Sequence, residues 1–345
     1  MERIRVLVVD DSAFARKVMR EVLGRSPQLE VVGTARDGLE ALEKIEQLKP
    51  DVVTLDLIMP NLDGLGVLAE LPSGSGPRVV IVSMAGEESE LAIRALQAGA
   101  LDVVHKPTAL ASGRLYELSD ELIAKILTAA AARPLTRVPA AEPLLAASVA
   151  LRQPLQTERT LLVVGASTGG PQAITRLLKA FPATFPVPIA IVVHIPVGFT
   201  ASLAQRLDAE CALHVVEARA ELQLRPGLVV IAQAGIHLKL RRDGQHLRCD
   251  LDLAPLSTLH RPAVDVLFQS AALACGAGVM AVVLTGMGDD GLVGARAVHE
   301  AGGILLTEHE SSCVVYGMPR VVWEAGLSTG RAPIDQMSAS VVSHL

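Results

Sequence analysis

Short, almost wholly apolar runs recur along this chain and alternate with segments long enough to form helices. In the first 127 residues the apolar runs are Val6–Val9, Val31–Gly33, Val52–Leu55, Val79–Val82 and Asp102–Val104. Strands that are covered on both faces have nearly continuous apolar sequences, and strands that alternate with helices pair in parallel. The pattern therefore predicts an α/β domain built on a doubly wound, flavodoxin-like parallel sheet.

The same pattern returns in the C-terminal half of the chain. Its apolar runs are Leu161–Val164, Pro188–Val193, Leu228–Ala232 and Val279–Leu284. With a helix expected over Ala263–Cys275, this alternation predicts a second doubly wound α/β domain. The stretch Ile236–Leu251 has apolar and basic residues by turns around Asp243-Gly244, so we expect it to form a hairpin added to the second domain.

Between the two halves the sequence is rich in alanine and proline. Prolines at positions 134, 139, 143 and 154 stand too close together for a long helix. We expect a helix that ends near Ala132 and then a linker, with a short docking segment within Leu144–Leu151 as an alternative to a featureless connection. The predicted domains are residues 1–127 and 159–345, joined by a linker over residues 128–158.

Composition argues against several classes of function. The net charge is -6 and aromatic residues make up 2% of the chain, which disfavours binding to nucleic acids. The four cysteines lack the C-x-x-C spacing of zinc sites. No uninterrupted apolar stretch reaches the roughly 18 residues of a membrane span. We therefore expect a cytoplasmic protein that neither binds nucleic acid nor inserts into a membrane.

Charged and polar side chains follow the predicted strands of the first domain. They are Asp10 and Asp11 after the first strand, Asp56 after the third, Ser83 after the fourth and Lys106 after the fifth. Ligands of open α/β sheets bind beyond the carboxyl ends of the strands, so these groups should meet at one edge. Three converging carboxylates suit Mg²⁺, and an ammonium with a hydroxyl suits a phosphoryl group carried by Asp56.

Each of these residues also has an ordinary structural explanation when it is taken singly. Asp11 or Ser12 could cap a helix, Lys106 could be a surface lysine, and Ser83 could be a turn residue. The functional interpretation depends on their joint placement at the ends of strands of one sheet.

The motifs around these positions resemble the receiver domain of two-component response regulators. They are Val8-Val9-Asp10-Asp11-Ser12, Leu55-Asp56-Leu57-Ile58-Met59-Pro60, Asp63-Gly64, Ser83 and Lys106-Pro107. The resemblance implies phosphoryl transfer from a histidine kinase to Asp56, with Asp10 and Asp11 helping to hold Mg²⁺. Val103 departs from the pattern, because receivers often carry an aromatic switch residue three positions before the lysine.

The first apolar run of the second domain leads directly into a serine between glycines. In Gly165-Ala166-Ser167-Thr168-Gly169 the small neighbours allow a tight turn that presents Ser167 at the sheet edge beside backbone N–H groups. The spelling fits the G-x-S-x-G elbow of serine hydrolases. The alternative is a phosphate-binding loop, which would require a Walker lysine or a ribose-binding acid about 20 residues further on, and neither is evident.

A serine hydroxyl needs a base, and the base needs an orienting carboxylate. Nine histidines compete for the role of base. His194 follows the second strand of this domain and is the best placed, with His260 as the runner-up. Asp289 and Asp290 both follow the last apolar run, and spacing alone does not choose between them. We expect one of them to face solvent or to cap the helix beginning near Leu292.

Longer motifs in this half resemble the catalytic domain of the chemotaxis protein-glutamate methylesterase family, CheB. They are Gly165–Gly170, His194-Ile195-Pro196 with Gly198-Phe199-Thr200, His260-Arg261-Pro262 with Asp265, Leu284–Gly291 and Ser312–Pro319. The resemblance implies a triad of Ser167, His194 and Asp290, with the Met287 backbone N–H as oxyanion donor and no cofactor for the esterase. The implied reaction is hydrolysis of glutamate γ-methyl esters, and deamidation of glutamines, on methyl-accepting chemotaxis receptors.

A receiver joined to an esterase implies regulation, with the receiver inhibiting the esterase until a chemotaxis-type histidine kinase phosphorylates Asp56. Two other classes of function compete with this interpretation. One is a phospho-switched protein that binds receptors without catalysis, against which the intact Ser167, His194 and Asp290 argue. The other is a receiver-linked transcription factor, against which the negative net charge and the lack of a basic helix-turn-helix pattern argue.

Overall fold

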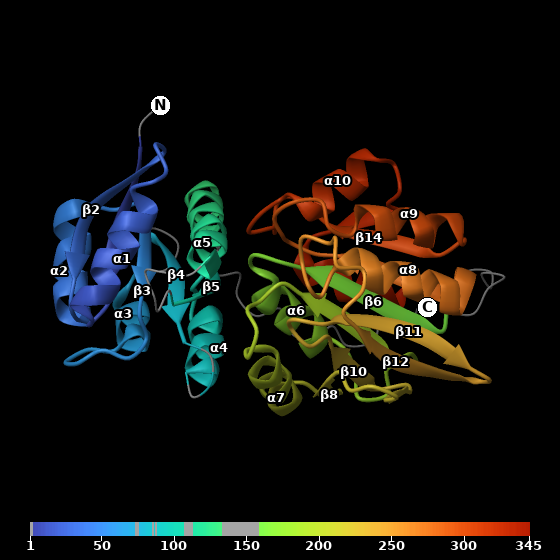
Figure 1. The fold of residues 1–345 in the computed structure, drawn as a ribbon. Coiled ribbons are helices and arrows are strands. Elements are labelled where there is room, and N and C mark those ends of the chain that lie inside the picture. The colour runs from blue at the N-terminus through green and yellow to red at the C-terminus, as the bar shows by residue number, and fades with distance from the viewer. Residues whose placement is uncertain (1–2, 73–75, 85, 87, 107–112, 133–158) are drawn as a thin grey trace. The chain divides into compact units, whose positions relative to one another are not determined.

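The computed structural model describes residues 3–72, 76–84, 86, 88–106, 113–132 and 159–345. It divides into two compact units, Met1–Thr136 and Arg137–Leu345 (Figure 1). Residues 133–158, which make up most of the predicted linker and include Leu144–Leu151, lie outside the described residues, as does Pro107. The linker limits proposed from the sequence therefore stay predictions.

The first unit contains one parallel sheet. Its strands are β1 (Ile4–Val9), β2 (Leu29–Ala35), β3 (Val52–Leu55), β4 (Arg78–Ser83) and β5 (Asp102–His105). Its helices are α1 (Ala13–Leu23), α2 (Gly38–Leu48), α3 (Gly64–Glu70), α4 (Ser89–Gln97) and α5 (Gly113–Ala131). All five predicted strands are present, and the helix expected to end near Ala132 ends at Ala131.

The strand order of this sheet is β2-β1-β3-β4-β5, with every pair parallel. Helix α1 contacts α5, while α3 contacts both α2 and α4, so the two groups of helices cover opposite faces (Figure 1). The strands are apolar because both faces are covered, and all four residues of β3 are buried. The strand order reverses between β1 and β3, which is where a doubly wound sheet opens a crevice for ligands.

The second unit contains a larger parallel sheet and a small antiparallel one. The parallel strands are β6 (Leu161–Ala166), β7 (Ile189–Val193), β8 (His214–Glu217), β10 (Leu228–Ile231), β13 (Val279–Val283), β14 (Ile304–Glu308) and β15 (Gly330–Ala332). The antiparallel strands are β9 (Gln223–Leu224), β11 (His237–Asp243) and β12 (His246–Asp252). The pair β11 and β12 is the predicted hairpin, which a third strand extends.

The helices of the second unit pack on the larger sheet. They are α6 (Gly170–Lys179), α7 (Thr200–Glu210), α8 (Val264–Cys275), α9 (Leu292–Glu300), α10 (Met318–Glu324) and α11 (Ile334–Val342), with a 3-10 turn η1 (Gly276–Gly278). Contacts join α6 to α7 and α11, and join α9 to α8 and α10. Among the described residues, no helix combines the length and the apolar character needed to cross a membrane.

The order of the larger sheet is β15-β14-β13-β6-β7-β10-β8, again wholly parallel. From β6 the chain first builds outward through β7, and it later returns to place β13 on the other side of β6. The carboxyl ends of β7, β6 and β13 therefore stand next to one another where the strand order reverses. This edge is the expected place for a catalytic or binding site.

Candidate functional sites

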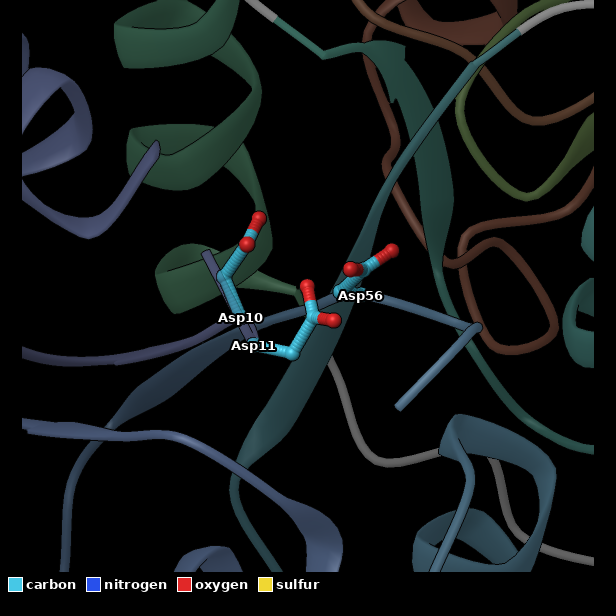
Figure 2. A group of neighbouring side chains, drawn as sticks. All are labelled: Asp10, Asp11 and Asp56. Carbon is cyan, nitrogen blue, oxygen red and sulfur yellow. The ribbon is translucent and has the colours of Figure 1, made fainter. Parts of the chain in front are cut away.

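Three carboxylates gather at the carboxyl ends of β1 and β3 in the first unit (Figure 2). Asp10 and Asp56 are each 2% exposed, whereas Asp11 is open to solvent. One oxygen from each carboxylate can be chosen so that all three lie within 4.8 Å of one another. A set of oxygen donors with one side open suits Mg²⁺, which keeps several water ligands. The predicted acidic cluster is thus assembled.

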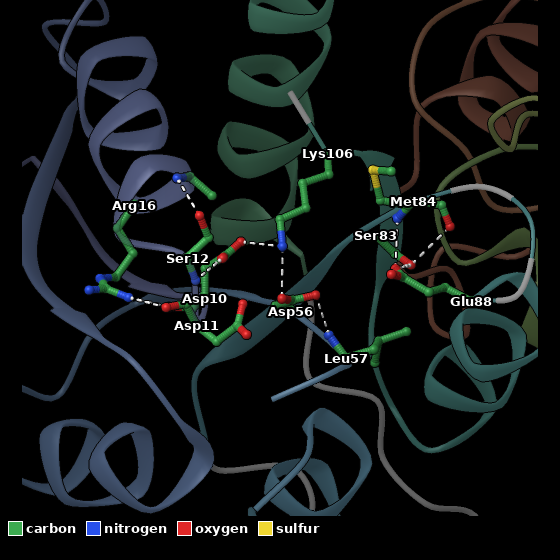
Figure 3. Close-up of polar contacts among 11 residues, drawn as sticks. Asp10, Asp11, Ser12, Arg16, Asp56, Leu57, Ser83, Met84, Glu88 and Lys106 are labelled. Carbon is green, nitrogen blue, oxygen red and sulfur yellow. Dashed lines mark hydrogen bonds and ion pairs between the residues drawn. The ribbon is translucent and has the colours of Figure 1, made fainter. Parts of the chain in front are cut away.

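Lys106 joins the two buried carboxylates (Figure 3). Its Nζ lies 2.8 Å from Asp10 Oδ2 and 2.8 Å from Asp56 Oδ2. Burial raises the pKa of Asp56, although Lys106 opposes the shift. Burial lowers the pKa of Lys106, but the two carboxylate partners outweigh this effect, so the pKa lies above its usual value. One ammonium balances only one of the two buried carboxylates, so the site can accept further positive charge.

Backbone N–H groups hold the two buried carboxylates in place. Asp56 Oδ1 accepts the N–H of Leu57 at 2.8 Å, and Asp10 Oδ1 accepts the N–H of Ser12 at 2.9 Å. Of the two candidates for a helix cap, Ser12 is the one that caps α1, through its hydroxyl. The side chain of Asp11 is therefore left at the solvent side of the cluster, where it can bind an ion.

The hydroxyl of Ser83 is engaged away from the carboxylate cluster (Figure 3). Ser83 Oγ donates to Glu88 Oε2 at 2.6 Å, and the N–H of Met84 donates to the same oxygen at 2.8 Å. Ser83 is fully buried at the end of β4, and Val103 on β5 is fully buried as well. Contact between Ser83 and a phosphoryl group on Asp56 would require this hydroxyl to leave Glu88, a partner that the sequence analysis did not identify.

In the second unit, Ser167 and His194 leave the sheet side by side. The register of β6 with β7 pairs Gly165 with Val192 and Ala166 with Val193. The backbone N–H of His194 then donates to Ala166 O at 3.1 Å. Paired positions on neighbouring strands are about 4.8 Å apart, so the sheet itself places the serine beside the histidine.

His194 is bonded to Asp290 as predicted for a base and its orienting carboxylate. His194 Nε2 lies 2.8 Å from Asp290 Oδ2, and the two side chains are 9% and 10% exposed. Burial alone would raise the pKa of Asp290, but His194 and the N–H groups of Asp265 and Val264 outweigh it, and the pKa lies below its usual value. An ionised carboxylate accepts hydrogen bonds only, so the neutral ring carries its proton on Nε2.

The tautomer leaves Nδ1 of His194 as the basic nitrogen. This atom is buried and makes no hydrogen bond within the described part of the chain. Ser167, which precedes α6, likewise has an Oγ without a hydrogen bond to any described residue, and it is partly exposed. The arrangement supplies a base with an unused lone pair next to a hydroxyl that can be reached from solvent.

Asp290 and Asp265 cap each other's helices. Asp290 accepts the N–H groups of Val264 at 2.8 Å and Asp265 at 2.9 Å, which open α8. Asp265 Oδ1 accepts the N–H groups of Gly291 at 2.9 Å and Gly294 at 2.7 Å, which open α9. Asp289 is exposed, as expected for one of the two aspartates. Asp290, the one that binds His194, caps α8 because the backbone donors nearest to it open that helix.

The close approach of α8 to the sheet depends on Gly165. A Cβ at this position would lie 2.3 Å from Val264 Cγ1, a distance that real side chains do not tolerate. Val264 is the first residue of α8, so the absence of a side chain at Gly165 allows the N-terminus of this helix to pack against the end of β6. The glycine thus brings the capped N-terminus of α8, and with it Asp290, to the serine turn.

The segment after β13 wraps closely around Ser167. The N–H of Ser167 donates to Thr285 O at 3.0 Å, and a Cβ at Gly286 would come within 3.0 Å of Ser167 N. The backbone of Met287, whose side chain is 42% exposed, follows directly. The N–H groups of Ser167 and Gly170 already have partners, so they are not the spare donors that we expected at the turn. Met287 stays the predicted oxyanion donor.

Glu308 holds the segment after β13 in place through hydrogen bonds, a role that was not predicted from the sequence. Its Oε2 accepts the N–H of Thr285 at 2.8 Å, and its Oε1 accepts the hydroxyl of Ser312 at 2.8 Å. The side chain is 1% exposed, and burial raises its pKa. Thr285 Oγ1 in turn donates to Thr168 O at 3.0 Å and accepts the N–H of Val315 at 3.0 Å. One buried carboxylate thus supports the serine turn.

Comparison with known proteins identifies both units. Residues 162–341 match the family described as CheB methylesterase, and residues 6–116 match the response regulator receiver domain. The chain is 59% identical to protein-glutamate methylesterase/protein-glutamine glutaminase 5 of Myxococcus xanthus, over 99% of this chain and 98% of that relative. This chain belongs to the CheB methylesterase family.

Two further comparisons agree with the CheB assignment. A protein-glutamate methylesterase/protein-glutamine glutaminase of Symbiobacterium thermophilum is 44% identical over 98% of this chain and 96% of its own length. The crystal structure of the Thermotoga maritima CheB methylesterase catalytic domain superposes with a TM-score of 0.53 at 37% identity, covering 55% of this chain and all of that domain. This CheB-family chain therefore joins a receiver to a methylesterase domain, and both have the predicted α/β fold.

Proposed function

We propose that this chain hydrolyses the γ-methyl esters of glutamate side chains on methyl-accepting chemotaxis receptors and deamidates receptor glutamines. The observation that supports this most directly is the 2.8 Å contact of His194 with Asp290, next to Ser167 at the end of β6. The relatives that match the whole chain carry both activities in their names. The proposed substrates place the reaction in the cytoplasm, where free cysteines such as those of this chain stay reduced.

In the proposed reaction His194 Nδ1 takes the proton of Ser167 Oγ as this oxygen attacks the ester carbonyl. Asp290 stabilises the imidazolium that forms, and the Met287 N–H donates to the oxyanion, a type of contact that typically contributes about 100- to 1000-fold in rate. His194 then protonates the departing methoxide, and methanol leaves. Water hydrolyses the acyl-enzyme with His194 as base again. A glutamine side chain follows the same steps with ammonia as the leaving group.

No step of this route uses a cofactor, because His194 carries each proton. For the receiver, by contrast, we propose a bound metal ion. Asp10, Asp11 and Asp56 would hold Mg²⁺, and their oxygen-only, partly open donor set fits that ion. When bound, Mg²⁺ offsets the negative charge of a phosphoryl group.

The phosphoryl group would pass from a histidine of a chemotaxis-type kinase to an Asp56 carboxylate oxygen. Lys106 already lies 2.8 Å from Asp56 and would pair with a phosphoryl oxygen. Ser83 would donate to another oxygen once its hydroxyl leaves Glu88. We propose that the unphosphorylated receiver inhibits the esterase and that phosphorylation of Asp56 relieves the inhibition.

The test is methanol release from methylated receptor membranes, with and without a small-molecule phosphodonor and Mg²⁺. Wild type should release methanol faster with the phosphodonor. Ser167→Ala should release none while its Asp56 is still phosphorylated, and Asp56→Ala should keep a basal rate that no longer responds. Activity in Ser167→Ala would refute the nucleophile, and an unchanged response in Asp56→Ala would refute regulation through that residue.

A further inference from the structure

A second histidine ring lies flat against the proposed base. The rings of His260 and His194 have centroids 4.1 Å apart and an interplanar angle of 20°. Aromatic rings at this distance and angle are stacked and stabilise each other. His260 comes from the segment between β12 and α8, which supplies neither the nucleophile nor the carboxylate of the proposed triad.

The segment that carries His260 is fixed to the core by another histidine. His237, fully buried at the start of β11, contacts Pro255 O at 3.2 Å and Thr258 Oγ1 at 3.1 Å through Nε2. Its Nδ1 accepts the N–H of Ala263 at 3.2 Å. Burial lowers the pKa of His237, which keeps the ring neutral and able to accept that hydrogen bond.

A backbone hydrogen bond reinforces this anchoring. The N–H of Gly235 donates to Arg261 O at 2.9 Å, directly beside His260. Hydrogen bonds therefore hold the segment on both sides of His260, and their partners lie in β11 or just before that strand. Its ring has a position determined by the fold rather than by chance contact at the surface, although the neighbouring Leu259 is 91% exposed.

The base needs this support because His194 has only one side-chain hydrogen bond among the described residues. A single bond from Nε2 to Asp290 does not by itself fix the plane of the ring, and rotation about that bond would change the direction of Nδ1, the nitrogen proposed to take the serine proton. A stacked ring opposes that movement. Its π face also favours the positive charge that His194 acquires when it takes the serine proton.

We propose that His260 is a positioning residue for His194, holding the imidazole in the plane that serves both Asp290 and Ser167 and stabilising the imidazolium. This proposal builds on the proposed esterase reaction. In this role His260 acts through the face of its ring and does not donate or accept a proton. A ring of another aromatic residue should therefore replace it, and a side chain that merely forms hydrogen bonds should not.

The test compares His260→Ala, His260→Phe and His260→Gln, with Leu259→Ala as the control at the neighbouring exposed position. In methanol release from methylated receptors, His260→Ala and His260→Gln should lose about tenfold in kcat with little change in KM, as expected for a stacking contact. His260→Phe should recover most of the loss, and Leu259→Ala should match wild type. Recovery by Gln instead of Phe, a change confined to KM, or no change in any variant would overturn the proposal.

A second readout separates this proposal from the proposed substrate. A fluorophosphonate forms a bond from its phosphorus to Ser167 Oγ, with loss of fluoride and transfer of the serine proton to His194, and it requires no receptor. Labelling should slow in His260→Ala and recover in His260→Phe, provided that thermal melts show both variants folded. If wild type is labelled but releases no methanol, the substrate proposal fails alone. If all variants are labelled at the wild-type rate, the role of His260 fails alone.

Discussion

The substitution Asp290→Asn tests the triad and the helix caps together. Asp290 Oδ2 accepts both His194 Nε2 and the N–H of Val264, while Oδ1 accepts the N–H of Asp265. An asparagine offers one acceptor and one NH₂ group. Whichever way its amide is turned, the NH₂ faces at least one donor, so the variant loses at least one buried hydrogen bond and gains a repulsive contact.

The structure sets the expected magnitudes. A buried donor left without its acceptor costs about 1–3 kcal/mol, so the free energy of unfolding should fall by that amount. The effect on rate is larger, because a neutral amide does not stabilise the imidazolium that forms on His194, and with its NH₂ group towards Nε2 it also favours the wrong tautomer of the ring. The corresponding change in a serine protease triad lowers kcat by about 10⁴-fold, and we expect a loss of this order here.

The assays are urea unfolding and methanol release, with Asp289→Asn as the matched control because Asp289 is adjacent and exposed. The pKa of Asp290 lies below 3.8, the usual value for an aspartate, so its ionised form stabilises the fold above pH 3.8 and this stabilisation is lost as the pH falls below 3.8. The difference in the free energy of unfolding between wild type and Asp290→Asn should therefore become smaller below pH 3.8. Wild-type stability together with less than about a tenfold loss of kcat would refute the reasoning.

Three further predictions concern other contacts. Gly165→Ala should lower the free energy of unfolding by about 1–3 kcal/mol, because its Cβ would lie 2.3 Å from Val264 Cγ1, and an unchanged melting temperature would contradict this. Burial raises the pKa of Glu308, so wild type should lose stability as pH rises above 4.5 towards that pKa. Glu308→Gln should remove this part of the pH dependence, and parallel urea-unfolding profiles for the two proteins would count against it. Glu88→Ala should speed phosphorylation of Asp56 by a small-molecule phosphodonor about tenfold, because the Ser83 hydroxyl would no longer have to break its hydrogen bond with a charged acceptor before it contacts the phosphoryl group. A slower reaction would argue that Glu88 assists the transfer.

The strands that position both sites could be predicted because each is a buried apolar run. The rule that ligands lie beyond strand ends then found Asp10, Asp56 and Lys106 without any structure. The same rule could have found Glu308, which ends β14 after the apolar Ile304–Leu306. The edge strands β8 and β15 have no such run and depend on pairing with an established neighbour.

Partners of single side chains were harder to predict. Spacing does not distinguish Asp289 from Asp290, because their directions depend on a loop in which Gly288 and Gly291 have φ angles of 85° and 101°. The resemblance to CheB selected Asp290, and the contact with His194 agrees with that selection. The bond of Ser83 with Glu88 and the stack of His260 on His194 join residues on separate segments, and a sequence does not specify such distances.

The register of β6 with β7 has a consequence for how this catalytic domain can diverge. Ser167 and His194 continue two hydrogen-bonded strands, so their separation is a property of the sheet and does not depend on the lengths of the loops that follow. Insertions near Val197 or Leu256, both exposed, would reshape the surface around the site without changing the spacing of nucleophile and base. Substrate preference and chemistry can therefore evolve, or be engineered, as separate traits in this domain.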